Sequence, residues 1–190
     1  MKQSERLKQL YDQPKSVFSA RDLKQIWGIE GNTFQKTVQR MTKKELIYRL
    51  ARGVYSLKED FNRYELVNTV ITPSYVSLNS ALVKADVAFQ YLTAVNAIAT
   101  YTHKRKVGGL LLRYYKIKDE IFYDDRGVYE RKGYTIAGPE RAICDAFYLG
   151  HLPNIDHPDY LNKTLFREVS EIYPKTVQER VEELIEGYDL

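Results

Sequence analysis

The residues with the clearest chemical potential are amides and cations on one side of a predicted helix, 33–44. Phe34, Val38 and Met41 follow the i, i+4, i+7 spacing of a buried helical stripe. The opposite side holds no acidic residue and consists of Asn32, Gln35, Lys36, Gln39, Arg40 and Lys43. Amides hydrogen-bond adenine edges, whereas cations bind guanine edges and phosphate oxygens. This pattern predicts a helix face that contacts DNA.

The segment that follows this helix adds two further cations. Residues 47–57 alternate in a way that predicts a β-hairpin, with Ala51-Arg52-Gly53 as its turn because Gly53 can adopt positive φ. Arg49 and Arg52 are then placed to contact phosphates or the minor groove rather than major-groove bases. The hairpin therefore extends the predicted DNA-binding face.

The elements that must position these residues are short and well signalled. A first helix over 4–11 ends before Pro14, and a second over 20–27 begins at Ser19 with a Ser-x-x-Asp capping box. Asn32 is the expected N-cap of the helix that carries the cations. Helix, tight turn, helix and hairpin is the order of a winged helix-turn-helix, which places one helix against bases and the hairpin beside phosphates.

The charge distribution favours the same interpretation. Residues 1–60 hold 13 Lys and Arg against 7 Asp and Glu, whereas residues 61–190 hold 16 against 18, within an overall charge of +4. Clustered cations attract polyphosphates, so the basic N-terminal third suits nucleic acid.

The cysteine content and hydropathy predict the compartment. The chain has one cysteine, Cys144, which is expected to pack internally, and a chain with a single cysteine fits a reducing cytoplasm. No run approaches the roughly 18 apolar residues of a membrane helix, so no membrane partner is expected.

The rest of the chain predicts an α+β domain with a small, mainly antiparallel sheet and C-terminal helices. The division is a DNA-binding domain over 1–58 and a second domain over 59–190. The expected strands are 97–102, 110–116, 121–123 and 134–136, separated by turns at 103–109, 118–120 and 124–133. The expected helices are 64–70, 77–84 with Ser77 as cap, 140–149, 159–172 and 177–186.

An enzyme is the rival class. Carboxylates close to a lysine could hold Mg²⁺ and activate water, as in a metal-dependent nuclease. The candidates are Asp119, Glu120, Asp124, Asp125 and the run Glu130-Arg131-Lys132. Turn chemistry explains these charged segments better, since Asp124-Asp125-Arg126-Gly127 has the composition of a turn between strands and no tighter catalytic motif is present. A second cluster, His151, Asp156, His157 and Asp159, matches no zinc-binding spacing. We therefore expect no catalytic residue, no metal and no cofactor.

Four segments resemble a known family. They are Val17–Leu23, Leu50–Tyr55, Ser74–Leu82 and Ile136–Asp145, the last with the pattern Ala-x-Pro-Glu-Arg-Ala. Over about residues 15–150 the chain resembles the AbiEi-type antitoxins, regulators found with bacterial abortive-infection systems. The resemblance implies a winged helix that binds operator repeats and represses its own operon. It also implies a nucleotidyltransferase-like toxin as functional partner, neutralised through the second domain without a stable complex. A stand-alone regulator, whose second domain dimerises or senses a partner, is the alternative.

The segment 136–145 has two interpretations from its residues. Glu140 lies in the first turn of a helix opened by Pro139, where the helix dipole favours a negative charge. Arg141 and Asp145 are spaced for an i, i+4 ion pair. Such residues either fix the architecture of the second domain or form a surface that supports antitoxin activity.

Overall fold

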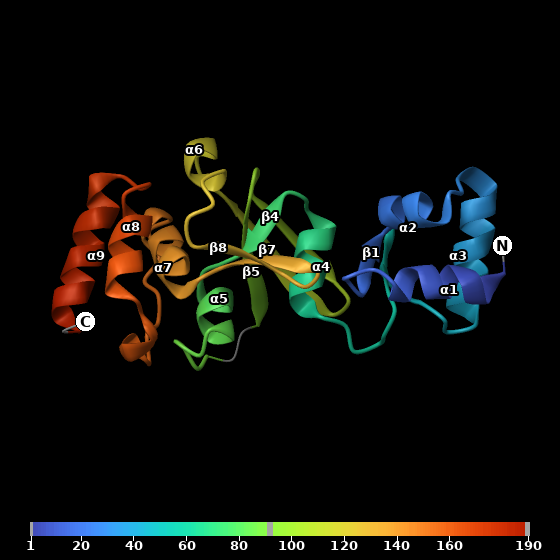
Figure 1. Cartoon of the computed structure of the whole chain (residues 1–190), viewed down its shortest axis with the longest axis horizontal. Helices are drawn as coiled ribbons and strands as arrows, with labels where there is room; N and C mark the ends of the chain where they lie inside the picture. Colours follow the sequence, from blue (N-terminus) through green and yellow to red (C-terminus); the bar gives the residue numbers. More distant parts are fainter. Residues whose placement is uncertain (1, 91–92, 189–190) are drawn as a thin grey trace.

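The chain extends along an elongated α+β molecule, with α1 near one end and α9 at the other (Figure 1). This arrangement comes from a computed structural model, which describes residues 2–90 and 93–188. Three helices and a small sheet form the N-terminal unit, a larger sheet occupies the middle, and three helices close the far end. Within the described residues, no helix has both the length and the apolar character needed to cross a membrane.

The N-terminal unit packs its helices on a three-stranded antiparallel sheet of order β1-β3-β2. Its elements are α1 (Gln3–Tyr11), β1 (Val17–Ser19), α2 (Ala20–Trp27), α3 (Gly31–Lys43), β2 (Tyr48–Ala51) and β3 (Val54–Ser56). Its core holds the apolar stripes of all three helices and comprises Leu10, Phe18, Leu23, Trp27, Phe34, Val38, Met41, Ile47, Tyr55 and Leu57. The stripe predicted for residues 33–44 is therefore buried as expected.

The boundaries of α2 and α3 follow from side-chain and glycine signals. The capping box is confirmed: Ser19 Oγ accepts from the Asp22 amide at 3.1 Å, and the Asp22 carboxylate accepts from the Ser19 amide at 2.8 Å. Gly28 ends α2 in the left-handed region at φ 62°. The next helix begins at Gly31, two residues earlier than expected, with Glu30 at the N-cap position. The prediction that Asn32 caps α3 is therefore wrong, and Asn32 lies in the first turn.

The remainder of the chain is built around a six-stranded sheet of order β6-β7-β5-β4-β9-β8. Its strands are β4 (Ser74–Val76), β5 (Ala94–Ala99), β6 (His103–Val107), β7 (Leu110–Lys116), β8 (Val128–Arg131) and β9 (Tyr134–Ala137). The helices are α4 (Arg63–Val70), α5 (Asn79–Lys84), α6 (Asp119–Phe122), α7 (Pro139–Tyr148), α8 (Lys163–Ser170) and α9 (Lys175–Gly187), with a 3-10 turn at Pro158–Tyr160.

This sheet corrects the prediction of a small, mainly antiparallel one. It is mixed, because β5 pairs with β7 and β4 with β9 in parallel, whereas the other three pairs are antiparallel. It is also larger, because β4 lies where no strand was expected and β6 and β8 lie in segments expected to be turns. β6 and β8 are edge strands, and edge strands commonly carry charged residues in place of an apolar alternation.

Three local predictions in this part of the chain are also wrong. The expected strand 121–123 belongs largely to α6, whose single turn buries Ile121 and Phe122. Ser77 does not cap α5, which begins at Asn79. The expected helix 159–172 is a 3-10 turn followed by α8, because the Asn162 side chain caps α8 by accepting from the Leu165 amide at 3.0 Å.

The N-terminal unit is joined to the larger sheet through α4. One carboxylate oxygen of Glu65, which is buried, accepts from the Ser16 amide at 2.6 Å, the Ser16 hydroxyl at 2.8 Å and the Val17 amide at 3.0 Å. A second link joins the two hairpins, since the Gly108 amide donates to the Leu50 carbonyl at 3.3 Å. The backbone of β1 and of β2 is thus held by the second part of the chain.

Candidate nucleic-acid interface

A groove of about 750 Å³ separates α3 from the β2–β3 hairpin. Phe34, Val38 and Tyr55 contribute apolar lining and are themselves largely buried in the N-terminal core. The polar lining consists of Lys24, Gln35, Gln39, Thr42, Lys43, Arg49 and Arg52. Four of these side chains are cations and none is a carboxylate, so the groove concentrates positive potential.

The packing of α3 turns its amides toward this groove. Phe34 and Val38 anchor the helix in the core, and Phe34 packs against Trp27 with ring centroids 6.4 Å apart. With that stripe buried, Gln35 and Gln39 lie one turn apart on the adjacent side, and both are exposed. Two amides one turn apart on an exposed helix face match the spacing needed to reach neighbouring base pairs.

The hairpin presents its arginines on the other wall of the groove. Gly53 adopts φ 80° in the turn, and its carbonyl accepts from the Ala20 amide at 2.7 Å, which ties the tip to the start of α2. A β-bulge interrupts the register between Arg49 and Ala51. Arg49 and Arg52 are both exposed and both line the groove.

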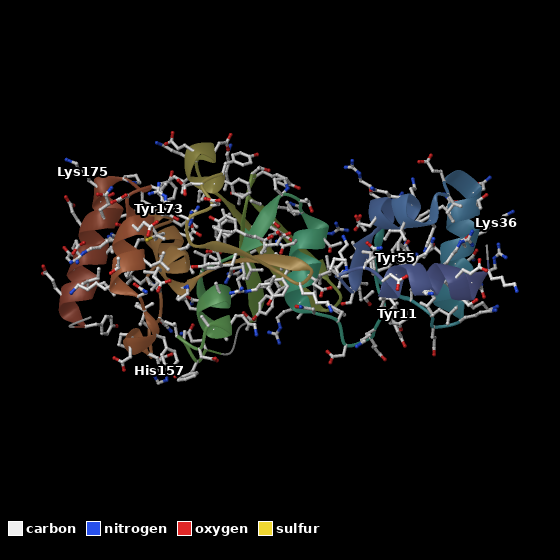
Figure 2. The ribbon with its side chains drawn as sticks, viewed as in Figure 1. Tyr11, Lys36, Tyr55, His157, Tyr173 and Lys175 are labelled. Atoms are coloured by element: carbon white, nitrogen blue, oxygen red, sulfur yellow. The ribbon has the colours of Figure 1, made fainter. Side chains whose placement is uncertain are left out.

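The eight predicted DNA-binding residues fall into two sets. All eight are exposed, and the structure brings Gln35, Gln39, Lys43, Arg49 and Arg52 to the groove. The other three, Asn32, Lys36 and Arg40, lie on the side of α3 outside the groove lining. There, Arg40 Nε donates to the Lys36 carbonyl at 3.2 Å, so the guanidinium lies along the helix. Figure 2 shows Lys36 projecting at the outer end of the N-terminal unit.

Sequence reasoning missed Lys24. It lies on α2, and its ammonium sits over the Phe34 ring, 5.6 Å from the centroid, at the edge of the groove. A cation–π contact of this kind fixes the position of the charge without neutralising it. The available signal was its place on the polar side of helix 20–27, whose apolar side is formed by Leu23 and Trp27.

The carboxylates of the nuclease alternative do not converge. Asp124 is held by Arg126, whose Nε and Nη2 donate to it at 3.0 and 2.8 Å. These charge-assisted bonds lower the pKa of Asp124 despite some desolvation. Glu120 pairs with Lys118 at 3.4 Å, whereas Glu130 lies on β8 and lines a cavity beside β1 and α2. Over residues 2–90 and 93–188, the structure gathers no three His, Cys, Asp or Glu side chains that could bind a metal ion.

The histidine cluster is also dispersed among structural contacts. His157 stacks on Tyr160 with centroids 5.4 Å apart and meets the edge of Phe89 at 4.7 Å. Asp156 accepts from the Phe89 amide at 2.7 Å. His151 packs against Tyr115 instead. The contacts of Asp156 and His157 hold the loop before α8 against Phe89, in the segment that follows α5.

The segment 136–145 forms the buried centre of the second domain. The predicted Arg141–Asp145 ion pair is present, with Nε and Oδ1 3.5 Å apart and both side chains 0% exposed. Asp145 also accepts from the hydroxyls of Tyr173 at 2.7 Å, Ser77 at 2.6 Å and Tyr75 at 3.2 Å. Burial raises the pKa of Asp145, against the lowering effect of Arg141 and the three hydroxyls.

The other hydrogen bonds of Arg141 and Glu140 are mainly to backbone groups, apart from one that Arg141 donates to the Tyr75 hydroxyl at 3.1 Å. The Arg141 guanidinium donates to the carbonyls of Asp124, Arg126 and Ile121, while Glu140 accepts from the Asn162 amide at 2.7 Å. Cys144 is buried beside them, as expected. These charges therefore fix the architecture of the domain, because none of them reaches the surface.

Comparison with known proteins adds no relative from which residue roles can be transferred. The sequence matches no protein-family model and no curated protein.

Proposed function

We propose that this protein binds double-stranded DNA as a winged helix-turn-helix, with α3 in the major groove and the β2–β3 hairpin beside the phosphates. The observation that carries the proposal is the protein groove between α3 and the β2–β3 hairpin. Two exposed amides and four cations line this groove, and no carboxylate does. A major groove about 12 Å wide accepts a helix of this kind. The nearby phosphates then meet the hairpin.

The two sets of predicted residues have different roles in this arrangement. Gln35 and Gln39 read base edges, since amides pair in bidentate fashion with adenine. Lys43, Arg49 and Arg52 bind the phosphates of the DNA strand that lies in the protein groove, beside the β2–β3 hairpin. Asn32, Lys36 and Arg40, on the outer side of α3, face the opposite strand of the major groove. A helix that lies between two phosphate walls needs cations on both sides, and α3 has them.

We further propose a regulatory role rather than a catalytic one: a cytoplasmic transcriptional repressor that acts at its own operon. The resemblance to AbiEi-type antitoxins supports this proposal and extends it to a functional partner, a nucleotidyltransferase-like toxin. The second domain carries the antitoxin function in that proposal. A stand-alone regulator without a toxin shares the DNA-binding mechanism and differs only in the second domain.

The DNA-binding proposal is tested by selection of duplexes from a random pool with the full chain, followed by anisotropy titration. We expect one enriched sequence, bound with a salt dependence that Arg52→Gln reduces by about 0.9 in slope, as for one lost phosphate contact. Lys175→Gln, a matched exposed cation at the far end of the molecule (Figure 2), should leave the slope unchanged. Recovery of random sequences only, or equal slopes for Arg52→Gln and wild type, would contradict the proposal.

The antitoxin part is tested separately by growth. Co-expression with an adjacent nucleotidyltransferase-like reading frame should relieve growth arrest caused by that reading frame. Failure to relieve the arrest, with DNA binding intact, would favour the stand-alone regulator.

A further inference from the structure

A second basic surface lies on the β6–β7 hairpin, outside the N-terminal unit. Residues 87–118 contain six Lys and Arg and no Asp or Glu, although residues 61–190 as a whole are slightly acidic. Five of the six are exposed, and three of these lie close together: Lys104 and Lys106 on β6, and Arg113 on β7. In the part of the chain that the structure describes, these three have no carboxylate partner.

Register places these three cations on one face of the sheet. Lys104 and Lys106 are two residues apart on a strand, so their side chains point the same way. Lys104 stands directly opposite Arg113 in the antiparallel pair. Like charges in directly opposed positions destabilise a sheet. A bound polyanion would remove this repulsion, whereas nothing described within the chain does so.

This surface continues the candidate interface in space. The tip of the β6–β7 hairpin touches the DNA-facing hairpin, since the Gly108 amide donates to the Leu50 carbonyl, next to Arg49. The same tip also packs on the segment between β3 and α4, because a Cβ at Gly108 would lie 2.7 Å from the Phe61 ring. Along β6, Lys106 and Lys104 lie about 7 and 13 Å from Gly108, at roughly 3.3 Å per residue. Duplex DNA carries one phosphate charge per about 1.7 Å, so this length spans several phosphates.

We infer that DNA bound by α3 continues past the β2–β3 hairpin onto β6–β7, where Lys104, Lys106 and Arg113 bind the phosphates that flank the recognised sequence. The inference rests on the proposed function and extends the footprint into the second domain. These contacts are to the DNA backbone alone, because the lysines of an edge strand offer positive charge and no amide that could hydrogen-bond a base edge. They add affinity and fix the direction of the DNA without adding sequence preference.

The test compares the double variant Lys104→Gln/Lys106→Gln with the charge-matched Lys175→Gln/Arg180→Gln, whose exposed cations lie on α9 at the opposite end. Binding of a duplex of random sequence is titrated by anisotropy across a range of salt concentrations. Two lost phosphate contacts lower the salt slope by about 1.8, which weakens binding up to roughly 60-fold near 0.1 M salt. The α9 variant should keep the wild-type slope.

A length series then locates the contacts. Wild type should gain affinity when the duplex is extended on one side of the recognised sequence, and the β6 variant should not. The β6 variant should melt at the wild-type temperature or above, since it removes like-charge repulsion. Equal slopes for the β6 variant and wild type, while Arg52→Gln still reduces the slope, would overturn this inference and leave the proposed function standing. Loss of DNA binding by wild type itself would overturn both.

Discussion

The buried carboxylate of Glu65 gives the sharpest prediction about how the two parts of the chain are coupled. One of its two oxygens, Oε2, accepts three hydrogen bonds, and two of these come from backbone amides at the start of β1. A hydrogen bond to a charged group contributes about 1.5–3 kcal/mol, and a buried amide left without a partner costs about 1–3 kcal/mol. Because the Ser16 and Val17 amides both lose their acceptor, we expect Glu65→Ala to destabilise the fold by about 3–5 kcal/mol. Glu65→Gln keeps one acceptor oxygen and should cost about half as much.

The assay uses Trp27, the one tryptophan of the chain, which is buried in the N-terminal core. Urea unfolding is followed by Trp27 fluorescence and by far-ultraviolet circular dichroism. In wild type the two transitions should coincide, and in Glu65→Ala the fluorescence transition should move to lower urea and separate from the dichroism transition. Glu59→Ala, an exposed carboxylate nearby in sequence, is the control and should change neither. Coincident transitions in Glu65→Ala, with a loss below about 1 kcal/mol, would refute the coupling.

Two further predictions concern charges inside the fold. Arg141→Met removes the counter-charge of Asp145 in a fully buried site and should lower the free energy of unfolding in urea by about 3–5 kcal/mol. Adding Asp145→Asn should recover part of that loss. If the losses of the two single variants simply add in the double variant, the pairing is contradicted. For Asp22, burial raises the pKa, but the hydrogen bonds from Lys15 and Ser19 outweigh it and the pKa is lowered. Its carboxylate therefore stabilises the fold above the unfolded pKa near 3.9, and this contribution is lost as pH falls through the lower folded value. Asp22→Asn should cost about 1 kcal/mol at pH 7 and progressively less below pH 4, and a difference independent of pH would contradict this role.

Local signals allowed the N-terminal elements to be predicted. The Ser19–Asp22 capping box and the stripe at Phe34, Val38 and Met41 act within one or two helical turns, so the sequence alone shows them. Edge strands lack such a signal. β6 reads as a charged turn, because an outer strand gains its pairing from β7 and needs no apolar alternation of its own.

The candidate interface was predictable as a set of residues but not as a surface. Exposure of Gln35, Gln39 and Arg52 follows from periodicity and turn chemistry. Their separation from Lys36 and Arg40 depends on where the hairpin packs, a tertiary contact set by the Ala20–Gly53 hydrogen bond.

The hydrogen-bond network around Asp145 in the second domain was likewise predictable only in part. The Arg141–Asp145 pair lies within one helix and was predictable from spacing. The hydroxyls of Ser77 and Tyr75 reach Asp145 from 68 and 70 residues away, so only the folded sheet brings them there. The prediction that Ser77 caps a helix was wrong for this reason.

The most direct test of the central claim is the specificity ratio of one double variant, Gln35→Ala/Gln39→Ala. Its affinity, and that of wild type, is measured for the selected duplex and for a duplex of random sequence at the same salt concentration. If these amides read base edges, the variant loses about 1–3 kcal/mol per bidentate contact on the selected duplex. Its affinity for random DNA should stay nearly unchanged, because Lys43, Arg49 and Arg52 still bind phosphates. An equal loss on both duplexes, or no loss on either, would contradict base recognition by α3.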